Sequence, residues 1–255
     1  MCIRDSNTGC FANDFEHGAY SWWQPHEERT VAVALQEAGY DTLLLGKYMN
    51  GYGGHAERIP PGWSHWFGFT SCVYYGPQVS EQGNITQYGD DVYSTDLIRD
   101  GALHFLRNRS SHRKPFFMYL SPKAPHAPYT PAARHSALFP RLACPRVRSF
   151  NESDDTQRWR PSWMCELPVE GDKVDLKHRK YVQSLQAVDE LVEAVMQELH
   201  ARHLLRSTYT IYTSDNGVAV GRHRLSFHKS VIYEEAVRVP LLISGPAVPC
   251  QPLVE

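Results

Sequence analysis

The sequence predicts an α/β protein with a mainly parallel sheet flanked by helices. Short, continuously apolar segments such as "DTLLL" (41–45) and "PFFMYL" (115–120) are typical of strands that are buried on both faces. These segments alternate along the chain with longer ones in which apolar residues recur at helical spacing. Alternation of this kind is the pattern of an α/β domain.

Helices are predicted at 25–40, 94–108 and 176–203. Strands are predicted at 41–48, 114–121, 208–213 and 238–246. Gly39 is expected to end the first helix, and Ser94 or Thr95 is expected to cap the second. The apolar segment "TYTIYT" (208–213) is predicted to be a buried strand.

One catalytic domain is predicted over residues 20–246, with a long irregular excursion at 122–175 that is rich in proline. Residues 1–19 read as an arbitrary start, because they contain no apolar core like that of a signal peptide. Residues 247–255 read as the beginning of a further region that is cut short.

Composition narrows the classes of partner. The chain has 255 residues, 42% hydrophobic and 21% charged, with a formal net charge of −2. This balance gives no global electrostatic reason to expect nucleic acid as a partner. No apolar run approaches the ~20 residues that span a bilayer, so no membrane span is expected.

Three sequons suggest passage through a secretory compartment. They start at Asn84, Asn108 and Asn151, which makes these asparagines candidate glycosylation sites. The alternative is a coincidence in a bacterial protein, where the motif has no meaning. The six cysteines are too sparse for a disulfide scaffold and leave the redox compartment open.

Polar residues follow three of the predicted strands, where ligands bind in open parallel sheets. These residues are Lys47, then Lys123 and His126, then Asp215 and Asn216, the last pair trailed by His223, His228 and Lys229. Carboxylate and amide oxygens suit Ca²⁺ or Mg²⁺. Lysine and histidine donors suit an oxyanion such as sulfate or phosphate. A cation site beside an oxyanion site suggests metal-assisted ester hydrolysis.

Each of these residues also has an ordinary structural interpretation. Asp215 and Asn216 precede Gly217, and this tripeptide is common in turns. Lys47 reads equally as a solvated lysine, and His126 as a histidine held in a proline-rich loop. Taken residue by residue, both interpretations remain open.

Several segments together resemble the type I sulfatases. They are "AGYDTLLLGKYMNGYG", "PPGWSHWFGF", "PFFMYLSPKAPHAPYTP", "SLQAVDELVE" and "YTSDNGVAVGRHRLSFHKSVIYEEAVRVPLLISGP", in the order found in that family. The resemblance covers about residues 20–246 and implies an alkaline-phosphatase-like α/β fold. Within the family the chain looks similar to algal arylsulfatases and to N-acetylglucosamine-6-sulfatases.

The resemblance implies a role for each candidate residue. Asp215 and Asn216 match the pair that ligates one divalent cation, usually Ca²⁺. Lys47 and Lys229 match the two lysines that contact the sulfate, and His126 matches the histidine that helps to protonate the leaving oxygen. His223 has a counterpart only in some members and is kept as a further substrate-binding candidate.

The family nucleophile is absent. It is a formylglycine made from the first residue of a C/S-x-P-x-R motif by the formylglycine-generating enzyme, and no such motif occurs in these residues. We therefore expect a sulfatase fragment, truncated at both ends and inactive and poorly soluble by itself. The expected substrate is a sulfated small molecule or sugar, and the expected location is lysosomal, secreted or otherwise extracytoplasmic.

Two alternatives remain at this stage. One is a phosphomonoesterase or phosphodiesterase of the same superfamily, although no Asp-x-x-x-His constellation of the two-metal kind follows "TSDNG". The other is a non-catalytic relative that binds sulfated glycans.

Overall fold

The computed structural model describes residues 24–109, 114–160, 168–229 and 231–249. These residues form two compact units. Unit 1 comprises the chain up to Arg141 together with Arg179–Val195, and unit 2 comprises Leu142–His178 and the chain from Met196 onward. The predicted start at 1–19 and the end of the predicted tail, 250–255, lie outside the described residues.

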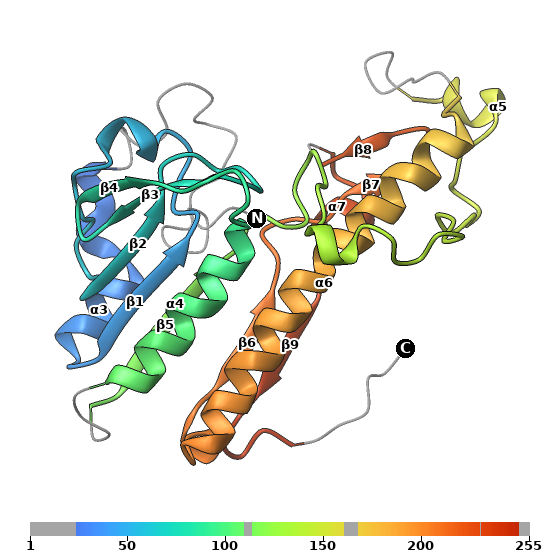
Figure 1. The fold of residues 1–255 in the computed structure, drawn as a ribbon. Coiled ribbons are helices and arrows are strands. Elements are labelled where there is room, and N and C mark those ends of the chain that lie inside the picture. Colours follow the sequence, from blue (N-terminus) through green and yellow to red (C-terminus); the bar gives the residue numbers. More distant parts are fainter. Residues whose placement is uncertain (1–23, 110–113, 161–167, 230, 250–255) are drawn as a thin grey trace. The chain divides into compact units, whose positions relative to one another are not determined.

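Unit 1 contains a five-stranded sheet in the order β4-β3-β2-β1-β5 (Figure 1). Its strands are β1 (Asp41–Gly46), β2 (His65–Phe69), β3 (Gln78–Glu81), β4 (Asn84–Gln87) and β5 (Phe116–Ser121). Strands β2, β1 and β5 are parallel, whereas β3 and β4 are added antiparallel. The sheet is therefore mixed, and the α/β class is confirmed.

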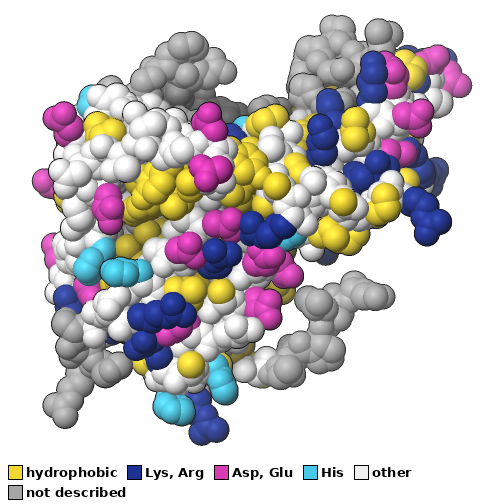
Figure 2. Space-filling view, in the orientation of Figure 1, with side chains coloured by type: hydrophobic (Ala, Val, Ile, Leu, Met, Phe, Trp, Pro, Cys, Tyr) yellow, Lys and Arg dark blue, Asp and Glu magenta, His cyan; other side chains and the backbone are white. Residues whose placement is uncertain are grey.

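Unit 1 also contains helical elements. They are η2 (Gln24–Arg29), α3 (Val31–Glu37), η3 (Tyr52–His55), α4 (Ser94–Asn108), η4 (Ala133–His135) and the Arg179–Val195 part of α6 (Gly171–Ala201). Helix α3 packs against β1, and α4 packs against both β1 and β5 (Figure 1). Acidic and basic side chains lie next to one another over α4 (Figure 2).

The parallel part of the sheet ends at one level. In the register, Gly46 of β1 is opposite Gly68 of β2 on one side and Ser121 of β5 on the other. Gly46 has φ +113°, and a Cβ there would lie 2.2 Å from the Ser121 carbonyl oxygen. Glycine is therefore required at this point, because any side chain would push β1 and β5 apart.

One core cluster of unit 1 fixes the chain that leaves β1. It consists of Leu44, Tyr48, Met49, Tyr52 and Trp66, which are all buried. Trp66 donates its indole N–H to the Tyr52 hydroxyl at 2.8 Å, and Tyr52 in turn donates to the Arg58 carbonyl at 2.8 Å. Buried aromatic residues with satisfied polar atoms hold their neighbours firmly. The segment after Lys47 is thus anchored by Tyr48 and Met49.

The prediction that Ser94 or Thr95 caps α4 is wrong. Ser94 and Thr95 lie inside the helix, and the residue at the N-cap position is Tyr93, whose side chain makes no capping bond. Ser94 and Thr95 are buried, as are Ile98 and Ala102. The requirement to place this face of the helix against the sheet overrides the local capping preference. The helix itself confirms the prediction for 94–108.

Unit 2 contains two small antiparallel sheets and short helices. Its elements are α5 (Asp154–Gln157), the two ends of α6, η6 (Leu205–Ser207), β6 (Thr210–Thr213), β7 (Ala219–Val220), β8 (Ser226–His228), α7 (Glu234–Val237) and β9 (Leu241–Ser244). Strand β6 pairs with β9, and β7 pairs with β8 (Figure 1). The predicted excursion at 122–175 contains, where described, only η4, α5 and the start of α6.

The expectation of a buried strand at "TYTIYT" is wrong. Strand β6 forms there, but Ile211 is 62% exposed, and Tyr209 and Tyr212 are exposed as well. Among the described residues β6 pairs with β9 alone, so one of its edges lacks a neighbouring strand. A two-stranded ribbon covers little apolar surface, and its apolar composition therefore does not lead to burial.

No helix in the described part of the chain is both long enough and apolar enough to cross a membrane.

Candidate functional site

In unit 1 the candidate site lies at the carboxyl ends of the three parallel strands. Lys47 directly follows β1, and its backbone N–H donates to the Ser121 carbonyl at the end of β5 at 2.9 Å. The loop after β5 carries Lys123 and His126, and the loop after β2 carries Cys72 and Tyr74. Because these strands end at one level, their loops meet at one edge of the sheet.

Two lysines act on the same thiol at this edge. Burial raises the pKa of the half-buried Cys72 thiol, and the positive charges of Lys123 and Lys47 act on that pKa in the opposite direction. Both lysines follow strands whose ends are opposite each other in the register of β1 and β5. The sheet thus brings together two cations that are 76 residues apart in the sequence.

Tyr74 connects Lys123 with the loop of His126. The Lys123 ammonium lies 5.4 Å from the centre of the Tyr74 ring. The Tyr74 hydroxyl donates to the His126 carbonyl, and burial raises the pKa of this hydroxyl well above its usual range. Tyr74 therefore remains a neutral donor. Ala124, which lies between Lys123 and His126 in the sequence, is buried in a second core cluster with Tyr74.

The His126 ring is exposed, and the hydrogen-bond partner of one ring nitrogen shows that this nitrogen carries a proton. Nδ1 lies 2.9 Å from the Ala127 carbonyl oxygen. Since a carbonyl oxygen only accepts, Nδ1 must carry a proton. When both ring nitrogens are protonated, the proton on Nε2 is the one that the ring can donate. The neutral ring that results keeps its proton on Nδ1.

In unit 2, Asp215 and Asn216 form a tight turn directly after β6. The Asp215 carboxylate accepts from the Asn216 backbone N–H at 2.9 Å, and the Asn216 side-chain N–H₂ donates to the Gly217 carbonyl at 2.8 Å. A Cβ at Gly217 would lie 2.0 Å from the Glu235 carbonyl oxygen. Glycine is needed here for this close approach of two backbone segments.

The donor types of this turn fit a hard cation. Asp215 is exposed, and the bond from the Asn216 amide nitrogen leaves the amide oxygen as the second donor. Ca²⁺ prefers carboxylate and amide oxygens and takes six to eight of them. Within the described residues no group of three or more His, Cys, Asp or Glu side chains could hold a metal ion. By itself the turn offers two oxygen donors, one from Asp215 and one from Asn216.

His223 lies between two carboxylates of unit 2. Its Nδ1 is 2.8 Å from Glu152, its Nε2 is 3.5 Å from Glu235, and its ring stacks on Tyr233 at 3.9 Å. Arg160 donates to the His223 carbonyl at 3.3 Å. Both ring nitrogens therefore face protein groups, a geometry that favours a positioning role. Lys229, the remaining predicted residue, is exposed after β8.

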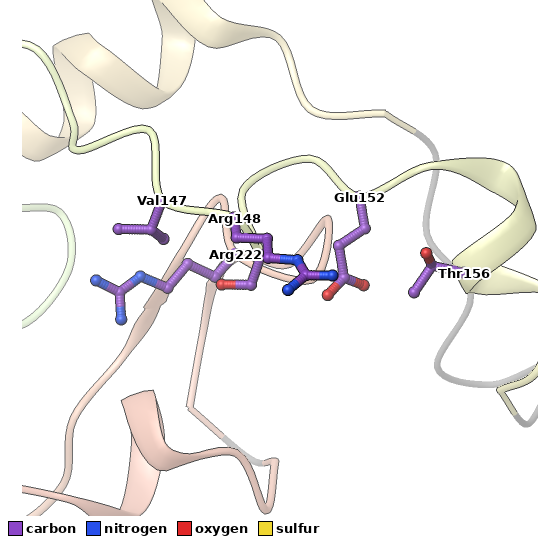
Figure 3. Close-up of a pocket in the computed structure, with 6 residues that line it drawn as sticks. Val147, Arg148, Glu152, Thr156 and Arg222 are labelled. Atoms are coloured by element: carbon purple, nitrogen blue, oxygen red, sulfur yellow. The ribbon is translucent and has the colours of Figure 1, made fainter.

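An open pocket of about 500 Å³ adjoins these residues in unit 2. Figure 3 shows Val147, Arg148, Glu152 and Thr156 from the excursion and Arg222 from the segment after β7. Arg222 forms an ion pair with Glu235 at 3.1 Å. The carboxylate of Glu152 already contacts Arg160 and His223. Ion pairs thus fasten the excursion to the segment that follows Asp215 and Asn216.

The family model described as Sulfatase matches residues 6–251. The chain belongs to the sulfatase family. This agrees with the resemblance that the sequence motifs indicated, and with the α/β fold described above.

Three similar proteins illustrate the relationship. Human N-acetylglucosamine-6-sulfatase is 34% identical over 240 residues, which are 89% of this chain and 43% of the human protein. Arylsulfatase of Volvox carteri is 31% identical over 263 residues, 91% of this chain and 40% of that protein. A solved structure described as a complex with its substrate D-glucosamine-2-N,6-O-disulfate has a TM-score of 0.76 and 26% identity, covering 96% of this chain and 60% of that one. This sulfatase chain thus spans less than half the length of the two curated relatives.

The structure places the predicted residues in two groups. Lys47 and His126 belong to unit 1, whereas Asp215, Asn216 and Lys229 belong to unit 2. From the sequence, Lys123 follows a predicted strand without an assigned role, and Cys72 and Tyr74 are not among the predicted site residues. A strand signal was available for these two, because "HWFGF" (65–69) is rich in aromatic residues and precedes them.

Proposed function

We propose that this chain is part of a sulfatase that hydrolyses sulfate monoesters of sugars, of the glucosamine 6-sulfate class. One observation carries the proposal. Lys47 and the His126 loop follow the carboxyl ends of β1 and β5, which are opposite each other in the sheet register. The similarity to N-acetylglucosamine-6-sulfatase favours a sugar sulfate, and the arylsulfatase relative makes an aryl sulfate the second candidate.

Lys47 suits recognition of the sulfate group. In the described residues it makes no ion pair, and its half-buried position limits competition from water. As the ester bond breaks, negative charge grows on the sulfuryl oxygens and on the leaving oxygen. A fixed ammonium group stabilises that charge without having to reorganise. Lys229 is proposed to contribute the second ammonium group.

His126 suits protonation of the leaving oxygen. When the S–O bond breaks, its electron pair remains on the sugar oxygen, which then needs a proton to leave as an alcohol. Protonated His126 supplies this proton from Nε2, and the ring becomes the neutral tautomer with its proton on Nδ1. The Ala127 carbonyl stabilises that tautomer by accepting from Nδ1 at 2.9 Å.

Two further groups are proposed for the reaction. Asp215 and Asn216 would hold a divalent cation, Ca²⁺ in most of the family, and the bound cation would offset negative charge on the sulfate. The nucleophile would be a formylglycine on a residue outside these 255 residues, made by the formylglycine-generating enzyme, since the chain contains no C/S-x-P-x-R.

We further propose a secreted, lysosomal or otherwise extracytoplasmic location with glycosylation at Asn84. Asn84 is exposed at the start of β4, which is an edge strand. Asn151 is half-buried and accepts a hydrogen bond from Val169 at 3.0 Å, and the Asn108 amide donates to the His104 carbonyl at 2.9 Å. Expression in a secretory host should give a glycoprotein whose mass falls after endoglycosidase treatment. Retention of that glycan by Asn84→Gln would contradict the assignment.

Ligand binding tests the function without requiring turnover. We expect the chain, in buffer with Ca²⁺, to bind glucosamine 6-sulfate more tightly than glucosamine 6-phosphate in isothermal titration calorimetry. Lys47→Ala should weaken sulfate binding about tenfold or more, which corresponds to the loss of one charge-assisted hydrogen bond. The chain alone should not hydrolyse 4-nitrophenyl sulfate.

Lys114→Ala is the matched control, because Lys114 precedes β5, at the edge of the sheet opposite to Lys47, and its ammonium group lies 3.8 Å from the Asp41 carboxylate. It removes the same charge and should leave the affinity unchanged. Tighter binding of the phosphate would favour a phosphoesterase instead. Turnover of 4-nitrophenyl sulfate by the chain would show that the expected dependence on an external nucleophile is wrong.

A further inference from the structure

Lys123 occupies a place equivalent to that of Lys47 on the neighbouring strand. Lys47 is the first residue after β1, and Lys123 is the second after β5. The two strands are parallel, and Gly46 and Ser121 are opposite each other in the register. Both side chains therefore start from the same edge of the sheet, within one or two residues of the same level.

The surroundings hold Lys123 in place. Its ammonium group lies over the Tyr74 ring at 5.4 Å, and a cation over an aromatic face is attracted to it. The Tyr74 hydroxyl is tied to the His126 carbonyl, and the His126 N–H donates to the Lys123 carbonyl at 2.8 Å. Lys123, Tyr74 and His126 thus form one connected unit, which positions Lys123 beside the proposed proton donor.

We propose that Lys123 is a specificity residue that binds a second anionic group of the substrate while Lys47 contacts the sulfate that is hydrolysed. This inference rests on the proposed function. Two ammonium groups at one edge favour a ligand with two negative groups over a ligand with one, because each group then gains a charge-assisted contact. The substrate class is therefore a sugar that carries a second sulfate or a carboxylate next to the cleaved ester.

The first experiment compares two probes, glucosamine 6-sulfate and glucosamine-2-N,6-O-disulfate, by calorimetry on the chain in buffer with Ca²⁺. The unaltered chain should bind the disulfate at least about tenfold more tightly, as one additional charge-assisted contact implies. Lys123→Ala should remove most of this preference while changing the affinity for the monosulfate less than about twofold. Lys123→Arg should retain the preference, and Lys114→Ala should leave both affinities unchanged.

The outcomes separate the two proposals. A preference that survives in Lys123→Ala would overturn the role of Lys123 and leave the proposed function intact. Equal affinities of the unaltered chain for both probes would also overturn it. If the unaltered chain binds neither probe, the proposed function fails at this site, and the role of Lys123 fails with it.

Cys72 provides a second readout that needs no ligand. Lys123 lowers the pKa of the Cys72 thiol against the larger effect of burial. Only the thiolate reacts with iodoacetamide, so Lys123→Ala should slow alkylation of Cys72 a few-fold at pH 8, measured on the Cys72 peptide by mass spectrometry. Lys114→Ala should not change the rate. An unchanged rate in Lys123→Ala would place its ammonium group away from this edge and overturn the inference.

Discussion

Strands β1 and β6 are similar in apolar character and differ in their surroundings. Both are short apolar segments that end in a polar motif, "LLLGK" in one and "IYTSDN" in the other. Leu44 in the centre of β1 is fully buried, whereas Ile211 in β6 is 62% exposed. In the described part of the chain, β1 has β2 on one side and β5 on the other, whereas β6 has β9 on one side only.

The difference shows that apolar composition specifies a strand but not its burial. Each flanking strand satisfies one backbone edge, and helices cover the faces only where a wide sheet exists for them to pack on. Helices α3 and α4 pack against β1 in this way. The β6–β9 ribbon instead leaves Tyr209, Leu241 and Ile243 exposed. Exposed apolar strands of this kind favour association between copies.

The largest expected effect comes from breaking the buried strand. Leu44→Ala should reduce the free energy of unfolding by about 2–5 kcal/mol, because it removes buried methyl groups and leaves a cavity beside Tyr48 and Trp66. Urea unfolding followed by tryptophan fluorescence measures this change, since Trp66 belongs to the same cluster. A loss below about 1 kcal/mol would mean that β1 is not the centre of this core.

A smaller effect is expected from an ionic contact of unit 1. Arg134 binds Asp96 of α4 at 2.7 Å and Glu190 of α6 at 2.5 Å. The hydrogen bonds from Arg134 hold the pKa of the Glu190 carboxyl below its usual value of 4.5. Because the folded-state pKa is the lower one, this stabilisation is present above about pH 4.5 and is lost as the pH falls through the folded-state value.

Glu190→Gln tests this contact. Above pH 5 it should cost less than about 1 kcal/mol, because the Glu190 side chain is 38% exposed and solvent screens the pair. As the pH falls through the folded-state pKa of Glu190, the variant and the unaltered chain should converge in stability. Urea unfolding at a series of pH values checks this result, with Asp155→Asn as a control for an exposed carboxylate in unit 2. A difference that grows towards low pH would reverse the assigned sign.

The smallest effect is expected in the exposed ribbon. Leu241→Ala in β9 makes the same chemical change as Leu44→Ala, but the side chain is 62% exposed. It should cost less than about 0.5 kcal/mol in urea unfolding, the range of ordinary surface substitutions. A cost above 2 kcal/mol would show that the ribbon is covered in solution, and the contrast with β1 would no longer hold.

Much of the fold followed from local patterns. Helix α4 and strands β1 and β5 form where the period of apolar residues predicted them. Strands β3 and β4 were missed because "QVSE" and "NITQ" are polar and short, and they form by pairing with β2 and with each other. Helix α6 begins at Gly171, five residues before the predicted start at 176, because its first residues lack a clear apolar period.

The candidate site was predicted only in part. Position directly after a strand identified Lys47, His126, Asp215 and Asn216 as candidates. Nothing in the sequence showed that Lys123 lies over Tyr74, because the two residues are 49 positions apart and meet through the pairing of β2, β1 and β5. Nor could it show that His223 faces Glu152, which is 71 residues away.

The sequence by itself determined the family, the α/β class and the identity of the polar residues that follow the strands, because motifs and apolar periods are local properties of the chain. The tertiary structure alone decided three features: the register that puts Gly46 opposite Gly68 and Ser121, the start of Lys47 and Lys123 from the same edge of the sheet, and the exposure of β6. These features depend on contacts between segments that are distant in the sequence, and local composition carries no record of such contacts.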